Sequence, residues 1–86
     1  MDKLWYLYIL ECGDGTLYTG ITDDVQKRLS AHNSGKGAKY TRGRRPLVLR
    51  YSEACLSHSS ALRREIEVKR LSRAEKLALI GNPDSE

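Results

Sequence analysis

The sequence predicts an α+β fold with three short strands and three helices in a single domain. Three apolar and aromatic stretches bounded by turn residues are typical of strands, and stretches with helical periodicity behind capping residues are typical of helices. At 86 residues the chain has room for only one hydrophobic core. We expect the domain to span residues 1–82 and residues 83–86 to form a short disordered tail.

The first two strands are predicted to form a hairpin. Residues 5–11 are rich in aromatic and aliphatic side chains, and residues 16–21 form the returning strand after a turn with two glycines. A three-residue loop from Gly13 to Gly15, with Gly15 in the left-handed conformation, is a favoured arrangement for such a turn.

The length of this turn decides the position of two tyrosines. With the three-residue loop, Tyr8 lies opposite Gly20 and Leu10 lies opposite Tyr18, so both phenols share one face of the sheet. A two-residue loop would instead place them on opposite faces, because a slip of one residue turns every side chain over.

The remaining elements follow in the order helix, strand, helix, helix. Thr22 or Asp23 is expected to cap the first helix, which runs to about Asn33 and is ended by Gly35. The others are a strand over residues 47–51, a helix over residues 57–71, and a helix over residues 73–80 that is capped by Ser72.

Composition narrows the class of protein. The longest apolar run, residues 5–10, is far shorter than the ~20 residues that span a bilayer, and it does not resemble a signal peptide. Cys12 and Cys55 are too far apart for a paired redox or zinc motif, so we expect free thiols. We therefore expect a cytoplasmic protein.

The net charge of +4 is concentrated in one stretch. Between residues 36 and 50 the chain carries basic side chains and no acid, which is typical of a phosphate-facing loop. A solvated basic surface is the alternative. The residues expected to bind nucleic acid are Lys36, Lys39, Arg42, Arg44 and Arg45.

One acid lies on the apolar side of the predicted second helix. The apolar residues of that helix fall within roughly 160° and are Ala61, Leu62, Ile66 and Val68. Glu65 lies near the middle of this arc, and a carboxylate there must be paired, bound to a metal or protonated. An ion pair with Lys69 is one interpretation; a magnesium ligand is the other, because hard cations prefer carboxylate oxygen.

Arg28 and His32 lie one turn apart on the first predicted helix. Considered alone, Arg28 is an ordinary surface arginine, and His32 is a histidine that the helix dipole stabilises at the C-terminus. Tyrosines in strands are likewise usually packing residues. Beside Tyr8 and Tyr18, the two side chains indicate a phosphate clamp and a hydrogen-bonding partner. A tyrosine acts as a base only where positive charge or a metal lowers its pKa.

Two tyrosine triplets, Tyr6-Leu7-Tyr8 and Tyr18-Thr19-Gly20, precede the helix that carries Arg28. With this spacing the chain resembles the GIY-YIG nuclease domain family, although Tyr6 replaces the glycine of the first triplet. The run from Ala61 to Glu65 is similar to the family helix that carries a metal-binding glutamate. The resemblance extends from about residue 4 to residue 80 and is greatest to the small stand-alone bacterial members.

The resemblance implies a three-stranded antiparallel sheet flanked by helices, and metal-dependent hydrolysis of a phosphodiester in DNA. It implies that Tyr18 helps to deprotonate the attacking water, with His32 and Tyr8 assisting. Arg28 would stabilise charge in the transition state, and Glu65 would hold one divalent cation. Mg²⁺ and Mn²⁺ both suit a lone carboxylate.

Three functions remain open at this point. The first is a DNA endonuclease that acts on branched, nicked or single-stranded DNA, structure-selective or nonspecific because no sequence-reading helix is evident. The second is a catalytically weak nucleic-acid-binding module that acts with a partner protein. The third is an accessory domain whose basic loop docks an acidic protein. The combination of candidate site residues favours the first, because binding alone needs no buried glutamate.

Overall fold

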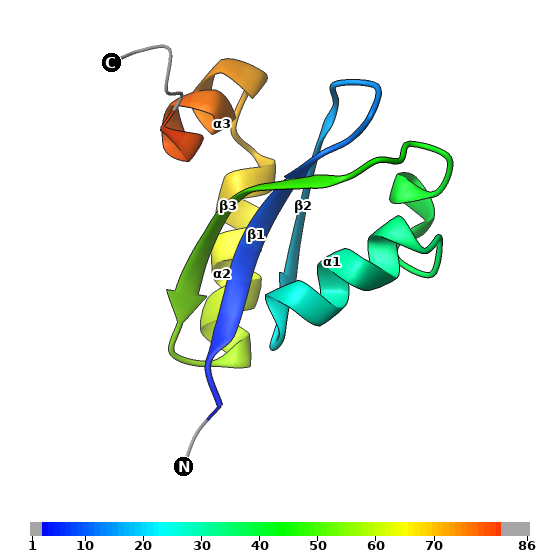
Figure 1. Cartoon of the computed structure of the whole chain (residues 1–86). Coiled ribbons are helices and arrows are strands. Elements are labelled where there is room, and N and C mark those ends of the chain that lie inside the picture. The colour runs from blue at the N-terminus through cyan, green and yellow to red at the C-terminus, as the bar shows by residue number, and fades with distance from the viewer. Residues whose placement is uncertain (1–2, 82–86) are drawn as a thin grey trace.

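A three-stranded antiparallel sheet forms the centre of the computed structural model, which describes residues 3–81 (Figure 1). The strands are β1 (Trp5–Glu11), β2 (Leu17–Thr22) and β3 (Val48–Cys55), and β1 lies between the other two. The predicted α+β fold is therefore confirmed. The expected end of the domain at residue 82 and the tail over residues 83–86 lie outside the described residues.

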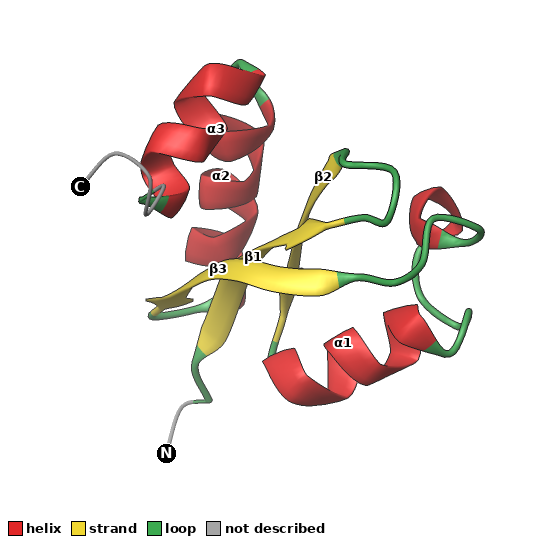
Figure 2. Ribbon diagram, turned by 45° about the horizontal axis from the view of Figure 1, so that its top comes forward, coloured by secondary structure: helices red, strands yellow, loops and turns green. Residues whose placement is uncertain are grey.

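Helices cover both faces of the sheet. They are α1 (Val25–Asn33), the short 3-10 turn η1 (Lys39–Thr41), α2 (His58–Lys69) and α3 (Arg73–Ile80). Figure 2 shows α1 on one side of the sheet and α2 with α3 on the other. Within residues 3–81 no helix has the length and apolar character needed to cross a membrane.

The predicted register of the hairpin is confirmed. Gly15 has a φ of +85°, the left-handed conformation that the three-residue loop requires. Tyr8 pairs with Gly20 and Leu10 pairs with Tyr18 across the two strands. Tyr8 and Tyr18 are thus on the same face of the sheet.

β3 is longer than the predicted strand over residues 47–51. It continues to Cys55, which pairs with Trp5 at the start of β1. Ser52 and Ala54 are exposed, so the second half of the strand lacks the apolar pattern that sequence reading depends on. Arg50 is an extra residue in the ladder, because the register between β1 and β3 shifts at this point.

The cap of α1 is Asp24, so the prediction of Thr22 or Asp23 was wrong. A carboxylate oxygen of Asp24 accepts a hydrogen bond from the Lys27 backbone N–H at 3.1 Å. The Thr22 hydroxyl accepts instead from the Asp24 backbone N–H at 3.1 Å, and Asp23 pairs with Lys3 at 3.1 Å. Both candidate caps therefore have other partners, and the helix starts later.

The other helix ends follow their capping residues closely. Ser57 caps α2, which ends at Lys69, two residues before the predicted end at residue 71. α3 has its predicted bounds, with a capping box between Ser72 and Glu75, and Gly81 follows it in the left-handed conformation. β2 lies one residue later than the predicted strand over residues 16–21.

The side chains of β1 alternate between two buried clusters. The cluster toward α2 and α3 contains Leu7, Ile9, Cys55, Ala61 and Val68. The cluster toward α1 contains Tyr8, Leu10, Cys12 and Leu47. Both cysteines are buried free thiols, as expected.

The apolar arc predicted for α2 was only partly correct. Ala61 and Val68 are fully buried, but Leu62 is 40% exposed and Ile66 is 53% exposed. The sheet is covered by a narrow line of α2 residues spaced four and three apart, and Glu65 lies on that line between Ala61 and Val68. Leu62 and Ile66 lie to the side of this line.

Candidate active site

A buried hydrogen bond joins β1 to α1 at the centre of the site. The Tyr8 hydroxyl lies 3.0 Å from Nε2 of His32. Tyr8 is 2% exposed and His32 is fully buried, although it occupies the last turn of its helix. His32 is therefore held by side-chain contacts inside the protein.

Burial shifts the pKa values of this pair in opposite directions. It raises the pKa of Tyr8, which the nearby Arg28 lowers and the charges of Tyr18 and Glu65 raise further. Burial also lowers the pKa of His32, and the positive charge of Arg28 adds to that effect. At neutral pH a protonated phenol thus lies beside a neutral imidazole.

Tyr18 stands on the same face and is part of an aromatic stack. Its ring centroid is 5.3 Å from that of His32 and 5.7 Å from that of Tyr40. The Arg44 guanidinium lies 4.3 Å from the Tyr40 ring centroid and pairs with Asp14 at 2.6 Å. Among residues 3–81 the Tyr18 hydroxyl has no hydrogen-bond partner.

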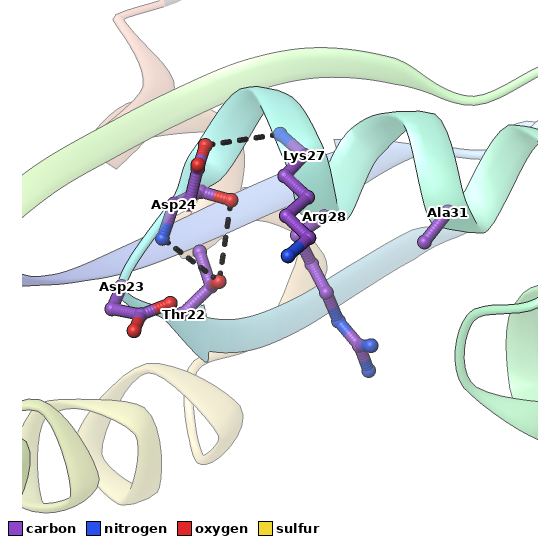
Figure 3. Close-up of a pocket in the computed structure, with 6 residues that line it drawn as sticks. All are labelled: Thr22, Asp23, Asp24, Lys27, Arg28 and Ala31. Atoms are coloured by element: carbon purple, nitrogen blue, oxygen red, sulfur yellow. Dashed lines mark hydrogen bonds between the residues drawn. The ribbon is translucent and has the colours of Figure 1, made fainter.

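Arg28 projects from α1 at the rim of a shallow depression. The residues that line this depression are Thr22, Asp23, Asp24, Lys27, Arg28 and Ala31. Figure 3 shows the Arg28 side chain extending away from the two aspartates. Arg28 makes no ion pair within the described part of the chain, so its guanidinium is available to an anionic ligand.

Glu65, the candidate metal ligand, lies on α2, which covers the other face of the sheet. Its side chain is 20% exposed, and one carboxylate oxygen lies 3.2 Å from the Lys69 ammonium. The ion pair considered from the sequence is therefore present. The charge of Glu65 also contributes to the raised pKa of Tyr8.

A clamp of two hydrogen bonds joins α2 to β3 next to Glu65. The neighbouring Arg64 donates from Nε and Nη2 to the two carboxylate oxygens of Glu53, at 2.8 Å and 3.2 Å. Tyr51 donates its hydroxyl proton to the same carboxylate at 2.5 Å. Two parallel bonds of this kind restrict rotation as well as separation, so α2 is held in one orientation on the sheet.

The five basic residues expected to contact nucleic acid divide into two groups. Arg44 and Arg45 have partners inside the protein, because Arg45 donates to the Asn33 carbonyl at 3.1 Å and Arg44 pairs with Asp14. These contacts fasten the loop to α1 and to the hairpin. The other three of the five, Lys36, Lys39 and Arg42, are exposed and make neither an ion pair nor a side-chain hydrogen bond within residues 3–81.

Sequence reading missed a second group of cations beside the site. Two shallow depressions between β2 and α3 share Leu17 and Lys76, and we call them together the β2–α3 groove. The side chains that line the groove beside Leu17 are Thr16, Tyr18, Thr19, Tyr40, Lys69, Arg73 and Lys76. Three cations thus face the edge of β2 next to the aromatic stack. They are scattered among acids in the sequence, and only the packing of α3 brings them together.

Comparison with known proteins agrees with this architecture. The model of the GIY-YIG catalytic domain matches residues 4–78. A UPF0213 protein of Halobacterium salinarum is 58% identical over 86% of this chain and 96% of its own length. A UPF0213 protein of Staphylococcus haemolyticus is 55% identical over 87% of this chain and 92% of its own length.

Two solved structures are similar to the fold. The solution NMR structure of a UPF0213 protein from Bacillus halodurans has a TM-score of 0.59 and 52% identity, and the match covers 93% of this chain and 85% of that chain. A solution NMR structure of a protein from E. faecalis has a TM-score of 0.61 and 40% identity, over 91% and 84% of the two chains. The family model spans both tyrosine triplets, the helix with Arg28 and the helix with Glu65. The chain therefore belongs to the GIY-YIG family, a nuclease-type family of catalytic domains.

Proposed function

We propose that this protein is a metal-dependent endonuclease that hydrolyses phosphodiester bonds in DNA. The observation that carries the proposal is the buried pair of Tyr8 and His32 at 3.0 Å, with the Arg28 guanidinium, which makes no ion pair within residues 3–81, on the same side. A phenol beside a neutral imidazole can pass on a proton, and a free guanidinium can hold a phosphate. Both functions favour attack of water on a phosphodiester.

The reaction is a displacement at phosphorus. Arg28 binds the non-bridging oxygens and stabilises the charge that develops on them. Burial raises the pKa of Tyr8, so Tyr8 does not act as a phenolate base. Its oxygen instead accepts a proton from the attacking water as its own proton passes to Nε2 of His32 in the same step. The bond from the water oxygen to phosphorus forms, the bond to the leaving oxygen breaks, and that oxygen takes a proton from solvent.

The resemblance to the family assigned the larger part in water activation to Tyr18. The geometry favours Tyr8 for this step, because of these two phenols only that of Tyr8 has a proton acceptor within hydrogen-bond distance among residues 3–81. Tyr18 packs against His32 and Tyr40 and forms the wall of the site. The two assignments predict different losses on substitution.

Glu65 fits the role of a metal ligand in an open site. No group of three or more metal-binding side chains occurs in residues 3–81, so a closed protein cage is not formed there. Mg²⁺ does not need one, since it keeps several waters and takes one or two carboxylates together with substrate phosphates. When bound, Mg²⁺ or Mn²⁺ would neutralise phosphate charge and lower the pKa of a coordinated water.

The β2–α3 groove and the exposed basic residues of the loop support DNA as the substrate. Both border the aromatic stack, where Tyr40 is 43% exposed. Cations on flexible stems contact phosphates and carry no sequence information, so we propose nonspecific or structure-selective cleavage of branched, nicked or single-stranded DNA. We place this activity in the cytoplasm, where buried free thiols such as Cys12 and Cys55 are ordinary.

The test is cleavage of labelled duplex, nicked, branched and single-stranded DNA by the purified protein in Mg²⁺, in Mn²⁺ and in chelator. Arg28→Ala and Glu65→Gln should abolish cleavage while circular dichroism shows an intact fold. Arg63→Ala removes an exposed cation of α2 that does not line the groove, so it is the matched control and should cleave normally. Cleavage that survives both site substitutions would rule out this site.

A second candidate is a catalytically weak nucleic-acid-binding module that acts with a partner protein. The pairing of Glu65 with Lys69 favours it, because a carboxylate engaged by an ammonium is less available to a metal. Mobility shifts across a salt series separate the candidates. A module would bind DNA in chelator, lose about one unit of salt slope on Lys76→Ala, and never cleave. Binding to an acidic protein but to no DNA would point to the third function.

A further inference from the structure

We propose that Thr41 is a positioning residue that sets the tautomer of His32, so that Nε2 carries the lone pair that receives the Tyr8 proton. Its catalytic consequence rests on the proposed function, whereas the position of the proton follows from the hydrogen bonds alone. Thr41 lies in η1, inside the basic loop, and is fully buried.

The protons in this chain of hydrogen bonds can be assigned one by one. The Thr41 hydroxyl lies 2.8 Å from the Ala38 carbonyl oxygen and 2.8 Å from Nδ1 of His32. A carbonyl oxygen cannot donate, so the single hydroxyl proton of Thr41 points to Ala38. Thr41 then presents only a lone pair to His32, and Nδ1 must carry a proton. A neutral imidazole has one N–H, so Nε2 accepts the hydrogen bond from Tyr8.

The imidazole stays neutral in this setting. The ring is fully buried, and the charged group near it is the cation Arg28, which opposes protonation. The other side chains that face the ring, Tyr8, Tyr18 and Thr41, are uncharged partners. The chain of donors therefore runs in one direction, from Tyr8 through His32 and Thr41 to the Ala38 carbonyl.

The backbone of the basic loop holds the ring in this position. A Cβ built at Gly37 would lie 2.2 Å from Nδ1 and 2.6 Å from Cγ of His32, so only a glycine permits this close approach. The Thr41 backbone N–H also donates to Ala38, at 3.0 Å, which fixes the turn that presents the hydroxyl. The loop thus orients the imidazole as well as offering cations to solvent.

The direction of the chain matters for the reaction. With a proton on Nε2, His32 would donate to the Tyr8 oxygen and could accept nothing from it. With the proton on Nδ1, Nε2 has a free lone pair before the substrate binds, so it can accept the proton of Tyr8. Thr41 acts through His32 and does not touch the substrate.

The experiment compares Thr41→Val and Thr41→Ser in the full chain. The control is Ser59→Ala, which removes an exposed hydroxyl near the start of α2. Long-range ¹H–¹⁵N NMR of the histidine ring reports which nitrogen carries the proton without any need for nuclease activity. We expect the Nδ1–H form in the unmodified protein, in Thr41→Ser and in Ser59→Ala. In Thr41→Val we expect loss of that form, a kcat lower by ~100-fold and a KM changed by less than ~3-fold.

An Nε2–H tautomer in the unmodified protein would overturn the proposal, even if Thr41→Val failed to fold. So would a folded Thr41→Val that kept the Nδ1–H form, or one that kept full kcat in an active nuclease. An unmodified protein that showed Nδ1–H but cleaved no DNA would refute the proposed function and leave the tautomer assignment standing.

Discussion

The ring of Tyr8 lies directly over the backbone of Gly20 on the neighbouring strand. A Cβ built at Gly20 would come within 2.6 Å of the Tyr8 hydroxyl oxygen and within 2.7 Å of the ring carbon that bears it. Gly20, the last residue of the second triplet, therefore leaves the space that is occupied by the phenol of Tyr8, the last residue of the first triplet. The two triplets are joined in space because β1 and β2 pair at these residues.

Replacement of Gly20 by alanine should displace Tyr8. The added methyl group overlaps atoms in a packed interior, which typically costs about 1–3 kcal/mol in the free energy of unfolding. We expect that loss in urea denaturation, together with loss of DNA cleavage. A Gly20→Ala protein as stable and as active as the unmodified chain would contradict the close approach.

Removal of the two phenol hydroxyls should have unequal effects. Tyr8→Phe deletes the group that is bonded to His32, and we expect kcat for DNA cleavage to fall by about 10²–10⁴-fold. Tyr18→Phe keeps the ring that packs on His32 and should lose less. Single-turnover cleavage by both variants checks this order. The reverse order would assign water activation to Tyr18.

His32 should make the protein less stable below neutral pH. Burial holds its folded-state pKa below the ordinary value of 6.5, so below that pH the unfolded chain binds a proton that the folded chain does not. His32 therefore causes no loss of stability above pH 6.5. As the pH decreases from 6.5 to the lower folded-state pKa, the free energy of unfolding decreases by up to about 1.4 kcal/mol per pH unit.

Urea unfolding between pH 7.5 and 5 and an NMR titration of the ring measure this effect. His58→Gln is the control, because His58 is exposed at the start of α2, and it should leave the loss of stability unchanged. A His32 ring that titrates at or above 6.5 would be incompatible with its burial.

The two carboxylate partners of Arg64 should differ in what they contribute. Glu53→Gln weakens two partly buried, parallel bonds and leaves Tyr51 with a poorer acceptor, so we expect a loss of about 1–3 kcal/mol. Glu67→Gln removes an exposed pair on one helix and should cost less than about 1 kcal/mol. Thermal and urea unfolding compare the two; equal losses would mean that the clamp does not hold α2.

Local chemistry was sufficient for much of the fold and part of the site. The turn from Gly13 to Gly15 determined the hairpin register, since loop length and one left-handed residue specify how the strands pair. That register placed Tyr8 and Tyr18 on one face. The periodicity of α1 likewise placed Arg28 and His32 on one edge of the helix.

Prediction was wrong where an outcome depended on distant residues. β3 extends to Cys55 because the backbone of β1 pairs with it, although its own residues have no apolar pattern. Leu62 and Ile66 are exposed because the sheet meets only a narrow line of α2. A hydrophobic arc on a helix indicates which side chains favour burial. Whether they are buried depends on a neighbouring element that covers them.

The sequence by itself determined the chemical groups and their local spacing: two tyrosine triplets, an arginine and a histidine one turn apart, and an acid on a packing face. Tertiary structure alone decided how those groups are connected. Thr41 meets His32 from a separate turn, and Lys76 joins Lys69 beside β2 only because α3 packs there. Turns, caps and periodicity act over a few residues. The position of a proton within a buried chain of hydrogen bonds depends on every atom that encloses it, whatever its distance along the sequence.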